Sequence, residues 1–263
     1  MISAVVLAKN EQKSIARCLK SLSFCDEILV VDDYSTDNTV EVAKKQNAKV
    51  IEHSLNNNFG AQRNFAIEKV NNDWILFIDA DEVVSEKLKI ELSSIFSTKH
   101  QVPSTKYEKY LAYLIPRRDF FWGRELKYGE TQTARSRGII RLVKRDSGKW
   151  IGEVHEKYIT EGTVGKLSGF IDHYPHPTIV SFLIKINDYS SKRAEELDKS
   201  GVKQGIALML LTPLFKFIYT YFVKLGFLDG PSGFVYSFMM SFHSFLVRSK
   251  LYVHQKSGVP FVA

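Results

Sequence analysis

The first hundred residues alternate between short apolar runs and segments of helical periodicity. The apolar runs are ISAVVLA, EILVVDD, AKVIEH and DWILFIDA, which begin at residues 2, 27, 48 and 73. Alternation at this spacing predicts βαβ units and a parallel sheet. The runs are apolar at nearly every position, as expected for strands that are buried on both faces. The sequence therefore predicts an α/β fold with a mostly parallel sheet flanked by helices.

Helices are expected between and after these runs. In the first hundred residues they are predicted over 11–23, 39–46, 61–70 and 86–96. Asp37 is the expected N-cap of the second helix. After a polar loop at 97–109, strands are predicted in YLAYLIPRR and GIIRLVKR, and a long helix over 177–197. No segment reads G-x-G-x-x-G or G-x-x-x-x-G-K-[ST], which argues against a dinucleotide or P-loop site.

Carboxylates follow the second and the fourth apolar run. Asp32 and Asp33 end the second, and Asp79, Asp81 and Glu82 end the fourth. Ligands of an open parallel sheet bind at the carboxyl ends of its strands. In extended backbone Asp79 and Asp81 project to the same side, where like charges repel unless a cation lies near them. Because Mg²⁺ prefers carboxylates together with substrate phosphates, the pattern indicates a nucleotide diphosphate held through a metal. The alternatives are helix capping by the later acids and an Asx-turn at the earlier pair.

The charge of the chain is unevenly distributed. Residues 1–100 hold 12 Lys/Arg and 15 Asp/Glu, or −3, and residues 101–263 hold 24 and 14, or +10. The basic part favours an anionic partner such as lipid headgroups or a phosphorylated substrate. We expect no nucleic acid partner, because no nucleic-acid-binding motif is present. Cys18 and Cys25 form no disulfide or metal pattern, and the start of the chain lacks a basic leader, so a cytosolic protein with reduced thiols is expected.

Several segments together resemble a known family. VVLAKNE, EILVVDDYSTDNTVEVA, AQRNFAIE and WILFIDADEVVS resemble the nucleotide-sugar half of family 2 glycosyltransferases, which have the GT-A fold. RLVKR, WIGEVHE, HYPHPTIVSFLIKIN and GFLDGPSGF resemble the bacterial branch that includes lipopolysaccharide core β-1,4-glucosyltransferases. The resemblance covers nearly the whole chain. It implies a catalytic domain over 1–200, with a nucleotide-sugar half at 1–100 and an acceptor half at 101–200, followed by a helical region at 201–263.

The resemblance also implies roles for single residues. The residues expected around the UDP-sugar donor are Ala8, Glu11, Asp32, Asp33, Arg63 and Asp79. Among them, Asp33 is expected to bind the uracil ring and Asp79 to approach the ribose. Asp81 is expected to ligate a divalent metal, Mg²⁺ or Mn²⁺. Carboxylate oxygens suit both roles, because they accept hydrogen bonds and bind hard cations.

Sugar transfer with inversion needs a general base for the acceptor hydroxyl. The segment WIGEVHE offers Glu153, His155 and Glu156. In the family a carboxylate of this region is the base; Glu156 matches it best and Glu153 is the alternative. If the segment is extended, Glu156 faces away from the other two. Only one side of such a strand can face the site.

Basic residues in the second half are further candidates for contacts with the diphosphate or the acceptor. Alternation along RLVKR aims Arg141 and Arg145 to one side and Lys144 to the other, and the alternative is a solvated strand face. His173 is expected to reach the diphosphate or the metal, with a structural histidine as the alternative. KYGETQTARSRG departs from the aromatic, acidic acceptor-loop pattern of the family, which leaves the acceptor open.

Two apolar segments near the C-terminus predict helices at a membrane interface. The run over 206–223 contains Pro213 and Lys216, which disfavour a lipid-exposed span, and the run over 234–247 is too short to cross a bilayer. We expect a pair of helices lying on an anionic membrane surface. Packing on the catalytic domain or on another subunit is the alternative.

The sequence thus predicts a metal-dependent inverting glycosyltransferase that moves a hexose, glucose by the resemblance, from a UDP-sugar to a lipid-linked glycan such as lipopolysaccharide core. It is expected in the cytoplasm, peripheral on the inner membrane. A polyprenyl-phosphate glycosyltransferase is the nearest alternative. A sugar nucleotidyltransferase would need a glycine-rich loop that AKNEQKS lacks, and a non-catalytic scaffold would be expected to have lost the acids. The oligomeric state is left open.

Overall fold

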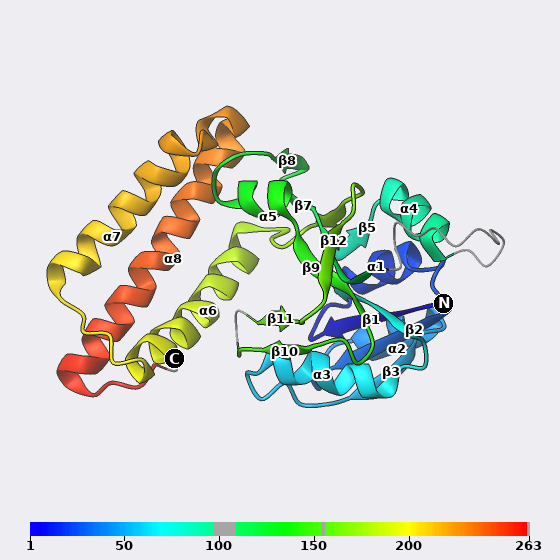
Figure 1. Cartoon of the computed structure of the whole chain (residues 1–263). Coiled ribbons are helices and arrows are strands. Elements are labelled where there is room, and N and C mark those ends of the chain that lie inside the picture. Colours follow the sequence, from blue (N-terminus) through cyan, green and yellow to red (C-terminus); the bar gives the residue numbers. More distant parts are fainter. Residues whose placement is uncertain (97–108, 154–155, 262–263) are drawn as a thin grey trace. The chain divides into compact units, whose positions relative to one another are not determined.

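The computed structural model describes residues 1–96, 109–153 and 156–261. They fall into two compact units (Figure 1). The first unit comprises residues 1–118 and 134–173, and the second comprises residues 119–133 and 174–263. The predicted loop at 97–109 lies outside the described residues except at its last position. The predicted boundary at residue 200 separates a catalytic region from a helical region by function, whereas the two units are distinguished by packing. This boundary stays a prediction.

The first unit is built on a seven-stranded sheet in the order β12-β6-β9-β4-β1-β2-β3. Its strands are β1 (Ile2–Ala8), β2 (Glu27–Asp32), β3 (Lys49–Glu52), β4 (Trp74–Asp79), β6 (Tyr110–Ile115), β9 (Ile139–Lys144) and β12 (Thr163–Lys166). Strands β3, β2, β1 and β4 are mutually parallel, whereas β9 runs antiparallel between β4 and β6. The predicted α/β fold with a mostly parallel sheet is confirmed.

Both faces of this sheet are covered. One face packs against α1 (Ile15–Ser21), α2 (Thr39–Lys45) and α4 (Glu86–Phe96), and the other packs against α3 (Phe59–Lys69) and the hairpin of β10 (Lys149–Ile151) and β11 (Lys157–Ile159). Successive residues of β1 therefore enter different cores, Val6 the first and Val5 the second. Burial on both faces explains why the strands are apolar at consecutive positions.

The loops after β1 and β2 are joined to each other, and this changes the predicted helix starts. Glu11 N donates to Thr39 Oγ1 at 2.8 Å, and Gln12 N donates to Asp37 Oδ2 at 3.2 Å. Because these residues bind the neighbouring loop, α1 begins at Ile15 rather than at residue 11. Asp37 bridges the loops, and the N-cap of α2 is the next residue, Asn38; the predicted cap was wrong.

A smaller sheet has the strand order β5-β13-β7-β8. Its strands are β5 (Glu82–Val84), β7 (Arg117–Phe121), β8 (Arg124–Leu126) and β13 (Ile171–His173), and α5 (Gln132–Arg137) follows a short 3₁₀ turn at Gly129–Thr131. The boundary between the units falls inside β7. In the first unit β5 pairs antiparallel with β13, which sets His173 opposite Glu82.

The second unit is mainly helical. Its helices are α6 (Ile179–Lys199), α7 (Ile206–Ile218) with a π-helical extension at Tyr219–Val223, and α8 (Gly230–Ser257). The predicted long helix is confirmed as α6. The predicted 14-residue helix at 234–247 is too short: α8 has 28 residues, because its polar second half still packs Val247 and Leu251 against Ala194 of α6.

The stretch GFLDGPSG between the two apolar segments is a tight helical corner rather than an open loop. A 3₁₀ turn at Gly226–Asp229 leads directly into α8. A Cβ at Gly233 would lie 2.0 Å from Gly226 O, so the close approach of the two turns requires glycine. In the described part of the chain one helical segment, Ile206–Val223, is long and apolar enough to cross a membrane, and 11% of it is buried.

Candidate active site

The predicted acids meet at one edge of the large sheet. In the register of the parallel strands, Ala8 lies opposite Asp32 and Leu7 lies opposite Asp79. The carboxyl ends of β1, β2 and β4 are therefore level with one another. This is the edge at which open α/β sheets bind their ligands.

Asp32 and Asp33 differ in what they contact. Asp32 is buried and accepts hydrogen bonds from Ser35 N at 2.7 Å and Ser35 Oγ at 2.6 Å, so it shapes the loop after β2. The Asp33 carboxylate accepts from Leu55 N at 2.9 Å and pairs with Lys9 Nζ at 2.7 Å. Asp33 thus stands at the rim of the sheet, with the Lys9 cation beside it.

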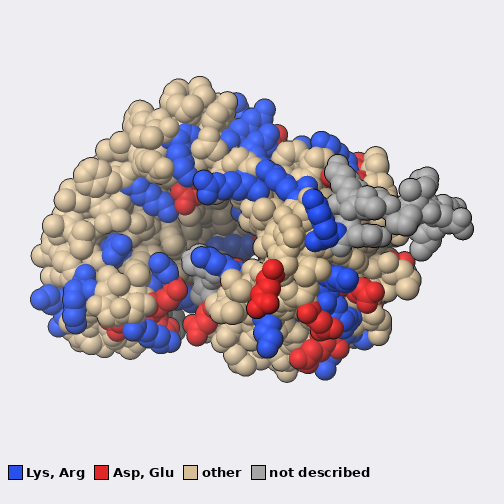
Figure 2. All heavy atoms as spheres, in the orientation of Figure 1, with Lys and Arg blue, Asp and Glu red and all other residues tan. Residues whose placement is uncertain are grey.

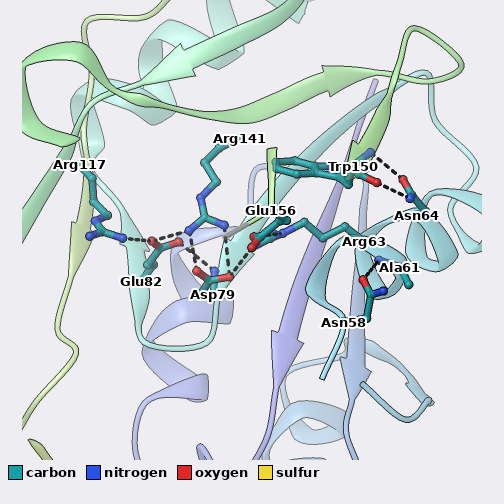
Figure 3. Close-up of polar contacts among 10 residues, drawn as sticks. All are labelled: Asn58, Ala61, Arg63, Asn64, Asp79, Glu82, Arg117, Arg141, Trp150 and Glu156. Carbon is teal, nitrogen blue, oxygen red and sulfur yellow. Dashed lines mark hydrogen bonds and ion pairs between the residues drawn. The ribbon is translucent and has the colours of Figure 1, made fainter. Parts of the chain in front are cut away.

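Arg63 lies at the centre of the site, between two carboxylates (Figure 3). Its Nη2 donates to Asp79 Oδ1 at 3.0 Å, and its Nε donates to Glu156 Oε1 at 2.9 Å. The side chain is 2% exposed, and its guanidinium lies 5.2 Å from the ring centroid of Phe77 and 5.0 Å from that of Trp150. Burial, two ion pairs and two aromatic rings fix this guanidinium in place.

Arg141 holds Asp79 from the other side. Its guanidinium contacts Asp79 Oδ2 at 2.6 Å and Glu82 Oε1 at 3.0 Å. Burial disfavours the ionised form of Asp79, but Arg141 and Arg63 hold the pKa of this carboxyl well below its usual range. Glu82 is completely buried and also accepts from Asp79 N at 2.9 Å. Burial raises the pKa of Glu82, although Arg141 opposes the shift.

Asp81 and His173 face each other at the end of the small sheet. Asp81 Oδ1 lies 3.5 Å from His173 Nε2, and each side chain is 14% exposed. Asp79 points instead to the two arginines, so the two aspartates of the DAD segment contact different partners. Among the described residues there is no group of three or more His, Cys, Asp and Glu side chains that could hold a metal ion.

The segment WIGEVHE begins in β10, at Trp150, and ends with Glu156, just before β11. Glu153 and Glu156 lie outside both strands, so strand alternation does not decide which carboxylate faces the site. Glu156 reaches Arg63 and is 16% exposed. The Glu153 side chain is exposed, and its carbonyl accepts from Phe59 N at 2.9 Å. His155 lies outside the described residues.

The remaining predicted residues lie at different distances from this centre. Ala8 is buried at the end of β1 and accepts from Asp33 N at 2.9 Å. Glu11 accepts from Ser14 Oγ at 2.5 Å. Arg145 lies at the opposite end of β4, where its guanidinium donates to the carbonyls of Ile67 at 2.9 Å and Asn72 at 3.0 Å. Arg141 and Arg145 are therefore not brought together: Arg141 contacts Asp79 and Glu82, whereas Arg145, just after β9, contacts main-chain carbonyls.

The sequence indicated most residues of the site, but not the contacts between them. Glu82 is a buried partner of Arg141 and lies 3.8 Å from Arg117. No signal in the sequence indicated these contacts beyond the place of Glu82 in the acidic cluster. Nor did any pattern indicate that Trp150 covers Arg63. These contacts join α3, β4, β9 and the hairpin, which are far apart in the chain.

A parallel sheet with carboxylates gathered at its carboxyl edge is the kind of site at which α/β enzymes bind nucleotides. Residues 3–141 match the model of the family described as Glycosyl transferase family 2. The chain therefore belongs to glycosyl transferase family 2, and it is a glycosyltransferase. The predicted resemblance is confirmed.

Relatives match over nearly the full chain. A glycosyltransferase of Rickettsia typhi is 32% identical over 261 residues, covering 95% of this chain and 86% of its own. The lipopolysaccharide core biosynthesis glycosyltransferase LpsC of Rhizobium meliloti is 27% identical over 259 residues, covering 95% of this chain and 92% of its own. Among solved structures, the glucosyl-3-phosphoglycerate synthase of Mycobacterium tuberculosis with phosphoglyceric acid has 16% identity and a TM-score of 0.48, covering 78% of this chain and 81% of its own.

Proposed function

We propose that this glycosyltransferase moves a hexose, with inversion, from a UDP-sugar to a lipid-linked glycan of the lipopolysaccharide core type. The observation that carries the proposal is the chain of contacts from Asp79 through Arg63 to Glu156, because it joins the sheet edge where a nucleotide sugar binds to a carboxylate that can serve as base. The relationship to LpsC, whose name assigns it to core biosynthesis, supports this class of acceptor.

The donor side of the site is assigned to the carboxyl edge of β1, β2 and β4. Asp33 accepts the ring N–H of uracil, and Asp32 holds the loop that presents it. Asp79 is fixed by its two arginines yet keeps 35% of its side-chain surface exposed, so it remains accessible to a ribose hydroxyl. Ala8 and Glu11 line the start of the neighbouring loop.

A divalent metal fits this site through Asp81 and His173. The two ligand atoms lie 3.5 Å apart and face each other, and both side chains retain some exposure. Two protein ligands are enough for Mg²⁺ or Mn²⁺ when diphosphate oxygens and water complete the shell. Asp79 is not a partner in this assignment, because its carboxylate is held by Arg63 and Arg141. When bound, the ion supplies positive charge that stabilises the departing diphosphate.

Glu156 is the proposed general base. Its carboxylate accepts the proton of the acceptor hydroxyl as the hydroxyl oxygen attacks the anomeric carbon and UDP leaves from the opposite face. Arg63 fixes one carboxylate oxygen of Glu156 at 2.9 Å. Glu153 is the weaker candidate, because its side chain is exposed.

The apolar surface of the second unit supports a cytoplasmic enzyme bound to the membrane. Leu210, Leu214, Phe215 and Phe222 are each more than half exposed along α7 and its extension. The predicted preference for anionic lipid has less support, since Lys216 pairs with Glu130 at 3.2 Å. Likewise, the Lys250 Nζ donates to side chains of α6. Apolar insertion is therefore the main proposed attraction.

The proposal is tested by turnover. Purified protein is given UDP-glucose and Mn²⁺ with either a truncated lipopolysaccharide core or undecaprenyl phosphate in mixed micelles. We expect UDP release with the first acceptor, at least about a hundredfold slower after Glu156→Gln, because a general base contributes about 10²–10⁴-fold. UDP binding should persist in this variant. Turnover with undecaprenyl phosphate alone would reassign the acceptor, and full activity of Glu156→Gln would reject the assigned base.

A further inference from the structure

Gly152 and Glu153, which follow β10 and precede Glu156 in the chain, are held by the first turn of α3. Phe59 N donates to Glu153 O at 2.9 Å, and Gly60 N donates to Gly152 O at 3.2 Å. These two N–H groups belong to the start of a helix, where the backbone has no acceptor of its own. A Cβ on Gly60 would lie 2.7 Å from Gly152 O, so a glycine is needed for the loop to come this close. The first turn of α3 thus fixes the backbone of Gly152 and Glu153.

Two further residues of the same helix extend this grip. Asn64 donates from Nδ2 to Trp150 O at 2.9 Å and accepts from Trp150 N at 3.0 Å, which fixes β10 to α3. Trp150 in turn covers the guanidinium of Arg63. The face of α3 that holds the hairpin therefore also presents the cation that reaches Glu156 (Figure 3).

We propose that Arg63 is a positioning residue, which holds Glu156 in place for proton transfer and links it to the donor-binding Asp79. This inference rests on the proposed function, because it takes Glu156 as the base. Arg63 suits this role because it is 2% exposed, uses Nε for Glu156 and Nη2 for Asp79, and has its plane restricted by two aromatic rings. A buried side chain of this kind does not have to touch the substrate to affect the rate.

Three charged residues act on the Glu156 carboxylate, directly or through a shared partner. Arg63 from α3 contacts the carboxylate directly, Arg141 from β9 acts on it at longer range, and Asp79 from β4 shares Arg63 with it. Removal of Arg63 leaves Glu156 without its fixed partner, whereas Asp79 keeps its contacts of 2.6 and 3.2 Å with Arg141. Loss of Arg63 should therefore affect the base far more than donor binding.

Surface charge is a separate feature from this buried pair. Figure 2 shows Lys and Arg side chains clustered over α5, with Asp and Glu side chains scattered elsewhere on the same face. Arg63 is not part of that surface, because it is buried under Trp150. Salt should therefore screen the surface cations strongly and the Arg63–Glu156 pair weakly, so moderate ionic strength isolates the effect of Arg63.

The first test compares three variants. Arg63→Gln removes the charge, Arg63→Lys keeps the charge but loses the two-point geometry, and Arg193→Gln removes a partly exposed arginine of α6 that pairs with Glu196. For Arg63→Gln we expect turnover to fall about a hundredfold, the effect of a misplaced catalytic group. The dissociation constant of UDP should change less than about threefold, and Arg63→Lys should recover part of the turnover.

A second readout does not depend on activity. The carboxyl carbon of Glu156 is followed by NMR at one fixed pH in protein labelled at its glutamate carboxyls, with Glu156→Gln to assign the signal. Loss of the partner that fixes this carboxylate should shift and broaden the Glu156 signal in Arg63→Gln and leave it unchanged in Arg193→Gln. An unchanged Glu156 signal in Arg63→Gln, or equal losses of turnover and UDP affinity, would overturn the inference. Failure of the wild-type chain to bind UDP would reject the proposed function while leaving the NMR comparison intact.

Discussion

Arg141 is the residue whose loss should destabilise the first unit most clearly. It is 6% exposed and is the direct partner of Glu82, which is completely buried. Arg141→Gln removes the cation and leaves the Glu82 carboxyl inside the protein. Removal of one partner from a buried ion pair costs about 3–5 kcal/mol. Asp79 suffers less, because it keeps Arg63 at 3.0 Å and part of its surface is exposed. We therefore expect a loss of about 3 kcal/mol in the free energy of unfolding, the lower end of that range.

The pH dependence of this loss has a definite sign. Burial already raises the pKa of Glu82 in the folded protein, and removal of Arg141 raises it further. A carboxyl whose folded pKa exceeds its unfolded pKa stabilises the fold below the unfolded value, and this contribution is lost as the pH rises through the folded value. Arg141→Gln should therefore be more damaging at pH 8 than at pH 5.

The assay is urea denaturation followed by circular dichroism, in EDTA so that no divalent ion binds beside the site. Adding Glu82→Gln to Arg141→Gln should recover about 2 kcal/mol, since the double variant buries no unpaired charge. Arg193→Gln serves as the surface control and should change stability by less than about 0.5 kcal/mol. Equal stability losses at both pH values, with no recovery in the double variant, would refute the reasoning.

Three further predictions concern other parts of the chain. Cys18 and Cys25 should resist alkylation at pH 8 until the protein unfolds, because burial raises the pKa of both thiols, that of Cys25 to about 12. Rapid labelling of the native protein, measured by mass spectrometry, would contradict this. The double variant Leu214→Gln, Phe222→Gln should sediment less with phosphatidylcholine–phosphatidylglycerol vesicles than the wild-type protein, because both side chains are exposed. Its circular dichroism should be unchanged, and undiminished vesicle binding would exclude α7 as the anchor. Gly233→Ala should lower the melting temperature, because its Cβ would lie 2.0 Å from Gly226 O, and an unchanged melting curve would count against that close approach.

The sequence predicted the order of strands and helices over residues 1–96, apart from the short strand β5. Continuous apolar runs and the spacing between them predicted the parallel strands, because burial on both faces leaves a strong compositional signal. The helix starts were less predictable. Asp37 has the residue type of an N-cap, but the loop after β1 lies close enough for Gln12 N to bind it. Contacts between loops distant in sequence decided where these helices begin.

The sequence predicted which acids gather at the sheet edge, but not which residues those acids pair with. Strand ends located Asp33, Asp79 and Asp81, since the carboxyl ends of parallel strands share one edge. Nothing in the DAD spacing indicated that Asp79 would face two arginines while Asp81 faces His173. Strand alternation does not apply to Glu156, because this residue lies between β10 and β11 and in neither strand. Local periodicity predicts which side of an element a residue occupies, but it does not predict which element packs opposite.

We propose that the carboxyl edge of the large sheet binds a UDP-sugar, with a metal at Asp81. The most direct test is calorimetric titration of UDP into the purified chain with and without Mn²⁺, repeated on Asp81→Asn. We expect UDP binding that is strengthened by Mn²⁺ in the wild type, and no strengthening in the variant, because Asp81 is the carboxylate ligand assigned to the ion. UDP binding that is absent under both conditions, or equally metal-dependent in Asp81→Asn, would contradict it.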